Sequence, residues 1–140
     1  AIRDNRKIDT NLKLKTTKYK ASNGTEYFLE IINKDNLLFG LLRLRLEKNN
    51  PTATVRELHV YGPALKLGEE GRLSSHGDDK KGPQHTGLGK QLIKKAEQIT
   101  KRKMKRKMRI ISGVGVRQYY KKLGYKTDKK GIYVEKKLFK

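Results

Sequence analysis

The sequence has no cysteine among its 140 residues. This absence excludes disulfides, thiolate metal sites and cysteine nucleophiles in this chain. The 3 histidines are too few and too dispersed to predict a metal cluster. No apolar run approaches the roughly 20 residues of a membrane-spanning helix, and we find no secretory signal. We therefore expect a soluble, cytoplasmic protein with no bound metal and no membrane partner.

Acidic residues are also scarce. Lys and Arg total 35 against 14 Asp and Glu, which gives a net charge of +21. Low hydrophobicity combined with high charge is typical of disorder. Here, however, the apolar residues recur at strand and helix spacing, so we predict a folded domain that carries its charge on the surface. A surface this basic attracts polyanions, of which nucleic acid is the first candidate and an anionic membrane the second.

The first half of the chain has the pattern of an antiparallel β-meander. Apolar and β-branched residues form segments that turn residues separate. The Asn23-Gly24 pair is a strong hairpin signal between the first two segments. The expected strands are residues 12–19, 26–32, 37–46 and 54–61.

The second half changes to helical spacing. One face of the first predicted helix consists of Leu88, Leu92, Ala96 and Ile99. The later elements are expected at residues 108–112 (strand), 116–123 (helix), 125–127 and 132–138 (strands). This order predicts one α/β domain with a mixed, mostly antiparallel sheet and flanking helices.

Composition also suggests boundaries. Residues 1–11 are polar and basic, and we expect a lead-in or linker there, followed by a single domain over 12–140. Residues 62–83 are rich in glycine and lack periodicity. A loop this long in a compact domain is usually functional, so we expect it to lie at the active site and gate it. Because the chain begins with Ala1 rather than Met, we expect a piece of a longer protein.

A glycine-rich motif lies where this loop enters the first helix, from Gln84 to Lys90. A helix N-terminus presents free N–H groups and a partial positive charge, and glycines let the backbone approach an anion closely. Gly87 and Gly89 therefore predict a pyrophosphate cradle, with an ordinary helix start as the alternative. The third glycine of a Rossmann fingerprint is absent, and Gln91 replaces the Ser or Thr of a Walker loop.

Two motifs in this order resemble those of the GNAT acetyltransferases. The segment from Gln84 to Gly89 is similar to the Q-x-x-G-x-G/A loop with which that family binds the pyrophosphate of acetyl-CoA. The segment from Tyr120 to Tyr125 is similar to the Y-x-x-x-G-F/Y end of a later helix. The resemblance implies the GNAT (acyl-CoA N-acyltransferase) fold, acetyl-CoA or CoA as the cofactor, and acyltransferase activity.

A narrower resemblance covers nearly the whole chain. The run from Ile111 to Arg117 is similar to the C-terminal acetyltransferase domain of the catalytic subunits of Elongator, and it is far more specific than the general GNAT pattern. Other segments that fit the same family are residues 24–26, 41–45, 58–62, 84–89, 96–99 and 119–125.

That family modifies tRNA, so the resemblance implies a larger protein. Its members join this domain to a radical S-adenosylmethionine domain with an iron–sulfur cluster, and they add an acetyl-derived carboxymethyl group to carbon 5 of the wobble uridine. The radical domain and its cofactors are absent from this chain. The implied partners are the tRNA anticodon arm, that domain in cis and Elongator-type subunits. Where the family carries zinc-binding cysteines, this chain has Ala1 and Asp4, so that site cannot form.

The resemblance also implies roles for single residues. Tyr120 matches the tyrosine that many GNAT enzymes place near the CoA sulfur, where it would protonate the departing thiolate. Tyr119, about 100° further around the helix, is the second candidate, and core packing is the alternative for Tyr120. The predicted pyrophosphate ligands are Gln84, His85, Thr86, Gly87, Leu88, Gly89 and Lys90. The backbone of Leu58, His59 and Val60 would bind the pantetheine arm.

Two further sets of residues are candidates. Glu57 and His59 share a strand face, so either could activate a nucleophile, although a solvated or structural pair is the commoner reading. The predicted RNA-binding residues are Lys101, Arg102, Lys103, Lys105, Arg106, Lys107 and Arg109, with Lys13, Lys15, Lys18 and Lys20 near the start. Generic lysine enrichment on solvated faces is the alternative.

We therefore expect an acetyl-CoA-binding, thioester-cleaving domain of a tRNA-modifying enzyme, with the cofactor between strands 54–61 and 108–112. One alternative is a protein lysine acetyltransferase, which needs an acidic acceptor groove; the net charge of +21 argues against it. The other is a basic RNA-binding module on a silent GNAT scaffold. The intact glycine loop and Tyr120 argue against that one.

Overall fold

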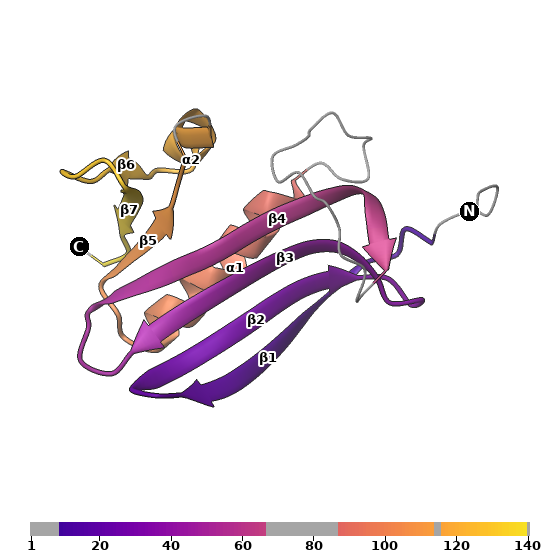
Figure 1. Cartoon of the computed structure of the whole chain (residues 1–140), viewed down its shortest axis with the longest axis horizontal. Helices are drawn as coiled ribbons and strands as arrows, with labels where there is room; N and C mark the ends of the chain where they lie inside the picture. Colours follow the sequence, from indigo (N-terminus) through magenta and orange to yellow (C-terminus); the bar gives the residue numbers. More distant parts are fainter. Residues whose placement is uncertain (1–8, 67–86, 114–115, 140) are drawn as a thin grey trace.

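The chain folds around one mixed β-sheet. A computed structural model describes residues 9–66, 87–113 and 116–139. Within them, 7 strands form a sheet of order β1-β2-β3-β4-β5-β7-β6, flanked by helices α1 and α2 (Figure 1). The elements are β1 (Lys13–Ala21), β2 (Gly24–Ile32), β3 (Leu37–Glu47), β4 (Thr52–Lys66), α1 (Leu88–Arg102), β5 (Lys107–Ile111), α2 (Arg117–Lys122), β6 (Lys126–Thr127) and β7 (Tyr133–Lys137).

The predicted meander is confirmed. Strands β1 to β4 pair antiparallel in chain order, and each covers most of its predicted segment. Asn23 takes a left-handed conformation (φ 62°) in the β1–β2 turn, as the hairpin signal requires. A side chain at Gly24 would collide with the backbone oxygen of Leu46, so this glycine also lets β2 and β3 approach each other.

The prediction of a loop from residue 62 was wrong for its first five residues. Strand β4 continues to Lys66 because Leu37 and Leu38 at the start of β3 pair with Lys66 and Leu65. This partner lies far away in sequence, and the local composition does not reveal it. Residues 67–83 of the predicted loop, and residues 1–8 of the predicted lead-in, lie outside the described residues.

One face of the sheet is covered by α1. Its predicted apolar face is confirmed, because Leu88, Leu92, Ala96 and Ile99 are all buried in the main core cluster. Gly40 on β3 makes room for the helix, since a Cβ there would stand 3.1 Å from Leu92 Cδ1. In Figure 1, α1 lies behind β3 and β4.

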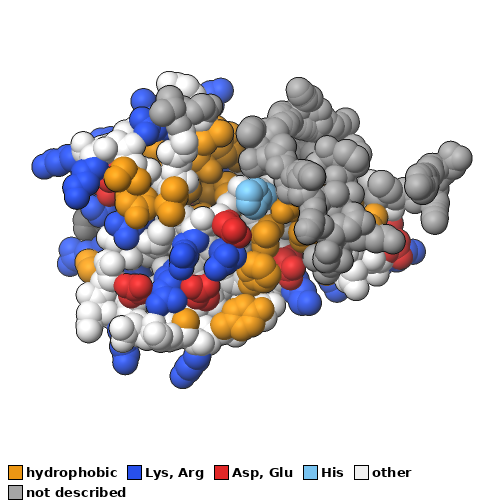
Figure 2. Space-filling model, viewed as in Figure 1, with side chains coloured by type: hydrophobic (Ala, Val, Ile, Leu, Met, Phe, Trp, Pro, Cys, Tyr) orange, Lys and Arg blue, Asp and Glu red, His pale blue; other side chains and the backbone are white. Residues whose placement is uncertain are grey.

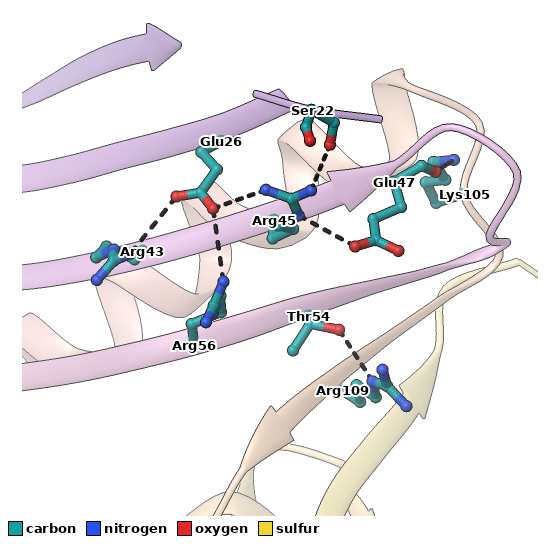
Figure 3. Close-up of polar contacts among 9 residues, drawn as sticks. All are labelled: Ser22, Glu26, Arg43, Arg45, Glu47, Thr54, Arg56, Lys105 and Arg109. Atoms are coloured by element: carbon teal, nitrogen blue, oxygen red, sulfur yellow. Dashed lines mark hydrogen bonds and ion pairs between the residues drawn. The ribbon is translucent and has the colours of Figure 1, made fainter. Parts of the chain in front are cut away.

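The opposite side of the sheet, which we call the open face, carries alternating charged side chains. Figure 2 shows Lys, Arg, Asp and Glu side chains mixed in its middle. Glu26 on β2 lies at their centre, with one carboxylate oxygen 3.0 Å from Arg45 Nη1 and ion pairs of 3.6 Å to both Arg43 and Arg56 (Figure 3). Within the described residues, this network ties three neighbouring strands together.

Replacing Glu26 should alter stability in acid. Burial alone raises the pKa of Glu26, but the Arg45 hydrogen bond and the charges of Arg43, Arg45 and Arg56 outweigh it and lower the pKa below the ordinary 4.5. The carboxylate therefore stabilises the fold above pH 4.5, and this stabilisation is lost as pH falls through the native pKa. In Glu26→Gln, the free energy of unfolding should fall less steeply below that pH than in the wild type. Denaturant titrations at several pH values measure this dependence. An equal fall of the free energy of unfolding with pH in both proteins would contradict the prediction.

Candidate cofactor site

Strands β4 and β5 separate at the centre of the sheet. They pair in parallel only from Thr52 and Lys107 to Val55 and Ile110. At this point β4 carries a bulge: Val55 pairs with Leu44 and Glu57 with Arg43, which leaves Arg56 as the extra residue. Beyond the bulge, β4 continues to Lys66 whereas β5 ends at Ile111. The two strands predicted to flank the cofactor thus diverge, and we call the gap between them the splay. Among the described residues, the β4 edge that faces the splay beyond Val55 has no strand partner.

The N-terminus of α1 is suited to an anion. Gly87 precedes the helix in a left-handed conformation (φ 81°), and the first turn contains no acidic residue. The first intrahelical bond runs from the N–H of Gln91 to the carbonyl of Gly87. The N–H groups of Leu88, Gly89 and Lys90 therefore lie at the positive end of the helix without intrahelical acceptors.

Gly89 is the point where three elements meet. A Cβ at this position would stand 2.5 Å from the hydroxyl oxygen of Tyr119 on α2 and 3.7 Å from Cγ2 of Val60 on β4. Only glycine lets the Tyr119 hydroxyl lie this close to the first turn of α1. The free N–H groups beside it form a candidate cradle, since pyrophosphate oxygens accept backbone N–H bonds. The described part of the predicted motif, Gly87 to Lys90, forms the start of α1, and its role as a pyrophosphate site stays a prediction; Gln84, His85 and Thr86 lie outside the described residues.

The two adjacent tyrosines have different surroundings. Tyr119 is 41% exposed and holds its hydroxyl against Gly89. Tyr120 is 6% exposed and lies in the core, edge-on to Tyr119 at 5.2 Å and to Tyr125 at 6.3 Å between ring centroids. Tyr120 therefore packs in the core, as the alternative interpretation has it, and the hydroxyl in the cradle belongs to Tyr119.

Both phenols are weak acids here. Burial, with a smaller effect of Tyr119, raises the pKa of Tyr120 to about 12, and burial also raises the pKa of Tyr119. A thiolate with a pKa of about 8.5 would not take a proton outright from such a group. At neutral pH both hydroxyls are protonated and can donate hydrogen bonds.

The pKa of Tyr120 predicts alkaline destabilisation. Its native pKa is raised from 10.0 to about 12, so its contribution to stability is complete below pH 10 and is lost as pH rises to about 12. The free energy of unfolding should fall by roughly 2–3 kcal/mol across this window on account of Tyr120. Denaturant titrations at several pH values measure this loss. It should be smaller in Tyr120→Phe, and an equal loss in both proteins would contradict the assignment.

A polar cluster that the sequence analysis missed supports these rings. The Tyr125 hydroxyl donates to Glu97 Oε2 at 2.5 Å, and Lys136 Nζ reaches the same oxygen at 3.2 Å. Lys136 also donates to the carbonyl of Leu123 at 3.1 Å. The cluster joins α1, the end of α2 and β7. Residues this distant in sequence give no local signal.

Glu57 and His59 lie on the open face, as alternation predicts. Glu57 forms an ion pair of 3.5 Å with Arg43, its cross-strand neighbour. The His59 ring stacks on Tyr61 at 6.1 Å, and its Nδ1 is buried without a hydrogen-bond partner among the described residues. Leu58 and Val60 point to the opposite side and pack against the core. The ion pair of Glu57 favours a structural role for that carboxylate.

The predicted RNA-binding run lies at the other end of α1. A helix of 15 residues is about 22 Å long, which separates the run from Gly87. Three of its members have structural partners: Lys105 donates to the carbonyls of Glu47 and Asn50, Lys107 pairs with Glu135, and Arg109 donates to Thr54 Oγ1. The exposed members are Lys101, Arg102, Lys103 and Arg106. None of the described helices is long and apolar enough to cross a membrane.

These features define the GNAT fold, as the sequence predicts: a mixed sheet, a splay between β4 and β5, and a glycine-rich helix start beside it. The Tetrahymena GCN5 structure has this fold with a TM-score of 0.57 at 15% identity, over 81% of this chain and 69% of that one. No protein-family model matches the chain.

Proteins related in sequence point to a narrower group than the fold does. Elongator complex protein 3 of Schizosaccharomyces pombe is 43% identical over 129 residues, which are 84% of this chain and 22% of that protein. The tRNA uridine(34) acetyltransferase of Dehalococcoides mccartyi is 40% identical over 80% of this chain and 25% of its own length. The structure of archaeal Methanocaldococcus infernus Elp3 matches at 37% identity and a TM-score of 0.67, over 90% of this chain and 30% of that one.

The predicted resemblance is thereby confirmed: the chain is homologous to part of the Elongator complex protein 3 and tRNA uridine(34) acetyltransferase sequences. It spans about a quarter of the length of these curated relatives.

Proposed function

We propose that the chain is the acetyl-CoA-binding and thioester-cleaving domain of a tRNA-modifying acyltransferase. The observation that carries the proposal is the Gly89 cradle, where the open end of α1, Val60 of β4 and Tyr119 of α2 converge beside the splay. Relatives named tRNA uridine(34) acetyltransferase support both the acyl chemistry and the tRNA substrate.

Different residues of the site would bind different parts of the coenzyme. Backbone N–H groups of Leu88, Gly89 and Lys90 would hold the pyrophosphate, where the helix end favours negative charge. The unpaired edge of β4 at Leu58, His59 and Val60 would hydrogen-bond the pantetheine arm. Acetyl-CoA supplies the activated acetyl group. The neutral hydroxyl of Tyr119, which lies against Gly89, would donate to the pyrophosphate. Tyr120 remains the candidate hydrogen-bond donor to the departing sulfur at the far end of the pantetheine arm.

The remaining parts of the hypothesis concern the longer protein. We propose that the tRNA anticodon arm is the acceptor and that the product is a carboxymethyl group at carbon 5 of the wobble uridine. A radical domain in cis would supply S-adenosylmethionine and the iron–sulfur cluster, and Elongator-type subunits and a cytoplasmic location would follow from the same resemblance.

A protein lysine acetyltransferase is the rival enzyme. It needs an acidic groove to attract the acceptor lysine, but on the described open face Glu26 and Glu57 are both paired with arginines. The second rival is a silent scaffold that only binds RNA. The free N–H groups at the start of α1, with no acidic residue in its first turn, favour cofactor binding over a silent scaffold.

The test is thiol release from acetyl-CoA, with and without tRNA, at fixed moderate salt. Release that depends on tRNA is expected; release that depends instead on lysine peptides would support the rival enzyme. Tyr119→Phe should weaken CoA binding, because its hydroxyl lies against Gly89 at the pyrophosphate end of the site, whereas Tyr120→Phe should slow release while CoA affinity changes little. CoA binding without release in any condition would contradict thioester cleavage by this domain. The absence of CoA binding would contradict the whole proposal.

A further inference from the structure

A group of side chains on the open face has no role in the proposed cofactor site. It consists of Tyr133 on β7 with Arg109 and Ile111 on β5, and we call it the Tyr133 platform. Ile111 pairs directly with Tyr133 across the two strands, and Arg109 pairs with Glu135 two residues further on. The three side chains therefore share one face of the sheet. Met108 and Ile110 point to the core on the other side.

The platform has an ordered aromatic and cationic geometry. The Arg109 guanidinium carbon lies 4.2 Å from the centroid of the Tyr133 ring. A hydrogen bond also holds the guanidinium in place: Arg109 Nε donates to Thr54 Oγ1 at 2.9 Å (Figure 3). Ile111 beside it is 50% exposed, and Ile132 next to Tyr133 is 51% exposed. A planar cation over an aromatic ring, with exposed apolar neighbours, is a surface on which another flat ring stacks well.

The platform lies at the opening of the splay. Val55 and Ile110 are the last paired residues of β4 and β5, so Ile111 is the first β5 residue beyond the junction. Glu57 and His59 continue the open face on the β4 side. The Gly89 cradle belongs to the side of the sheet that α1 covers. A ligand on the platform would thus face the splay from the side opposite the cofactor.

The charges around the platform fit a polyanion. Lys126, Lys129 and Lys130 on the β6–β7 hairpin are all exposed. The nearby carboxylates are engaged: Glu135 pairs with Lys107, and Asp128 accepts backbone N–H bonds from Ile132 and Tyr133. Figure 2 shows hydrophobic side chains over β5 and β7 with Lys and Arg at their margin. These lysines would not strengthen binding to an apolar protein surface, whereas they would attract the phosphates of a nucleic acid.

We propose that the Tyr133 platform stacks the target base of a single-stranded RNA loop and presents it to the splay, while Lys126, Lys129 and Lys130 contact the flanking phosphates. The inference rests on the proposed function and adds the place where the acceptor base docks. Aromatic rings and arginine planes on sheets are common stacking surfaces for unpaired bases. Such contacts are tolerant of base identity, so the platform positions the base and does not select it.

The absence of tryptophan makes the platform testable by fluorescence. Tyr133→Trp places the only indole of the chain on the platform. Tyr19→Trp is the matched control, since Tyr19 is 51% exposed between two lysines on β1, at the opposite edge of the same sheet. The probes are a stem–loop RNA with uridine at the wobble position and the same RNA with an abasic site there. The uridine RNA should quench the indole of Tyr133→Trp and the abasic RNA should not, whereas the indole of Tyr19→Trp should respond to both RNAs alike.

Affinity gives a second readout. Tyr133→Ala should weaken binding of the uridine RNA on the order of tenfold, leave the abasic RNA unaffected and keep the salt dependence of binding. Lys129→Ala should weaken both RNAs alike and lower the salt slope by about 1. If Tyr133→Ala fails to fold, Ile111→Asn serves instead, because that side chain is half exposed; it too should discriminate between the two RNAs.

The outcomes separate the platform from the proposed function. Wild-type chain that binds both RNAs equally, with no quenching of the indole in Tyr133→Trp, would overturn the platform and leave tRNA-dependent thiol release standing. The same result would suit a protein partner on this surface. Wild-type chain that binds neither RNA and releases no thiol with tRNA would overturn the proposed function and the platform with it.

Discussion

A Gly89→Ala substitution should weaken CoA binding by about 10- to 100-fold, the effect of losing one or two hydrogen bonds to a charged group. The added methyl group would lie 2.5 Å from the Tyr119 hydroxyl, so the phenol must move out of the cradle. The methyl group would also keep the pyrophosphate away from the first turn of α1. Calorimetric titration with CoA measures the loss.

Stability separates this effect from misfolding. Alanine favours a helix over glycine by roughly 0.8–1 kcal/mol, so the variant should be about as stable as the wild type despite its lost affinity. Gly113→Ala is the matched control, because a Cβ there meets nothing within 4 Å. Unchanged CoA affinity in Gly89→Ala, or an equal loss in Gly113→Ala, would show that the coenzyme does not bind at this helix end.

Truncation of Tyr125 should be the most destabilising single change near the site. This ring is 2% exposed and lies between Tyr120 and the ion pair of Glu97 with Lys136. Tyr125→Ala should cost about 3–5 kcal/mol, as other large aromatic truncations in cores do. Denaturant titration measures the loss. Thiol release should also fall, because Tyr120 and then Tyr119 lose the ring that supports them.

Tyr125→Phe isolates the polar part of this effect. It keeps the ring and removes only the hydroxyl that donates to Glu97, so the expected cost is about 1.5–3 kcal/mol. Burial, and then the bond to Glu97, raise the pKa of Tyr125, so this hydroxyl stays a donor at neutral pH. If Tyr125→Phe lowered the free energy of unfolding as much as Tyr125→Ala, the hydroxyl and not the packing of the ring would make the larger contribution to stability.

The fold was predictable because its signals are local. The spacing of Leu88, Leu92, Ala96 and Ile99 gave the covered face of α1, and the turn at Asn23 gave the first hairpin. The extension of β4 to Lys66 was missed, because it depends on pairing with Leu37 and Leu38. Local composition describes residues 62–66 only as a glycine- and proline-containing stretch.

The site was predictable as a motif but not as a geometry. The two glycines located the helix start, yet helical periodicity alone could not decide which tyrosine faces it. The structure gives Tyr119 that position because Tyr120 is held in the core by Tyr125. The spacing also said nothing of Glu97 and Lys136, which meet only after α1 and β7 have packed together.

The basic run that stands out in the sequence does not lie beside the candidate cofactor site. The run from Lys101 to Arg109 stood out in the sequence, but α1 separates most of it from the cradle. Lys126, Lys129 and Lys130 do not form a run in the sequence, and the β6–β7 hairpin at the edge of the sheet places them near Tyr133. A binding role for the run remains a prediction.

The central claim is that the first turn of α1 holds the pyrophosphate of CoA. The most direct measurement is the change in backbone amide resonances as CoA is added to the ¹⁵N-labelled chain. The largest shifts should belong to Leu88, Gly89 and Lys90, followed by Val60 and Tyr119. Shifts confined to the exposed residues from Lys101 to Arg106, or no shifts at saturating CoA, would contradict the claim.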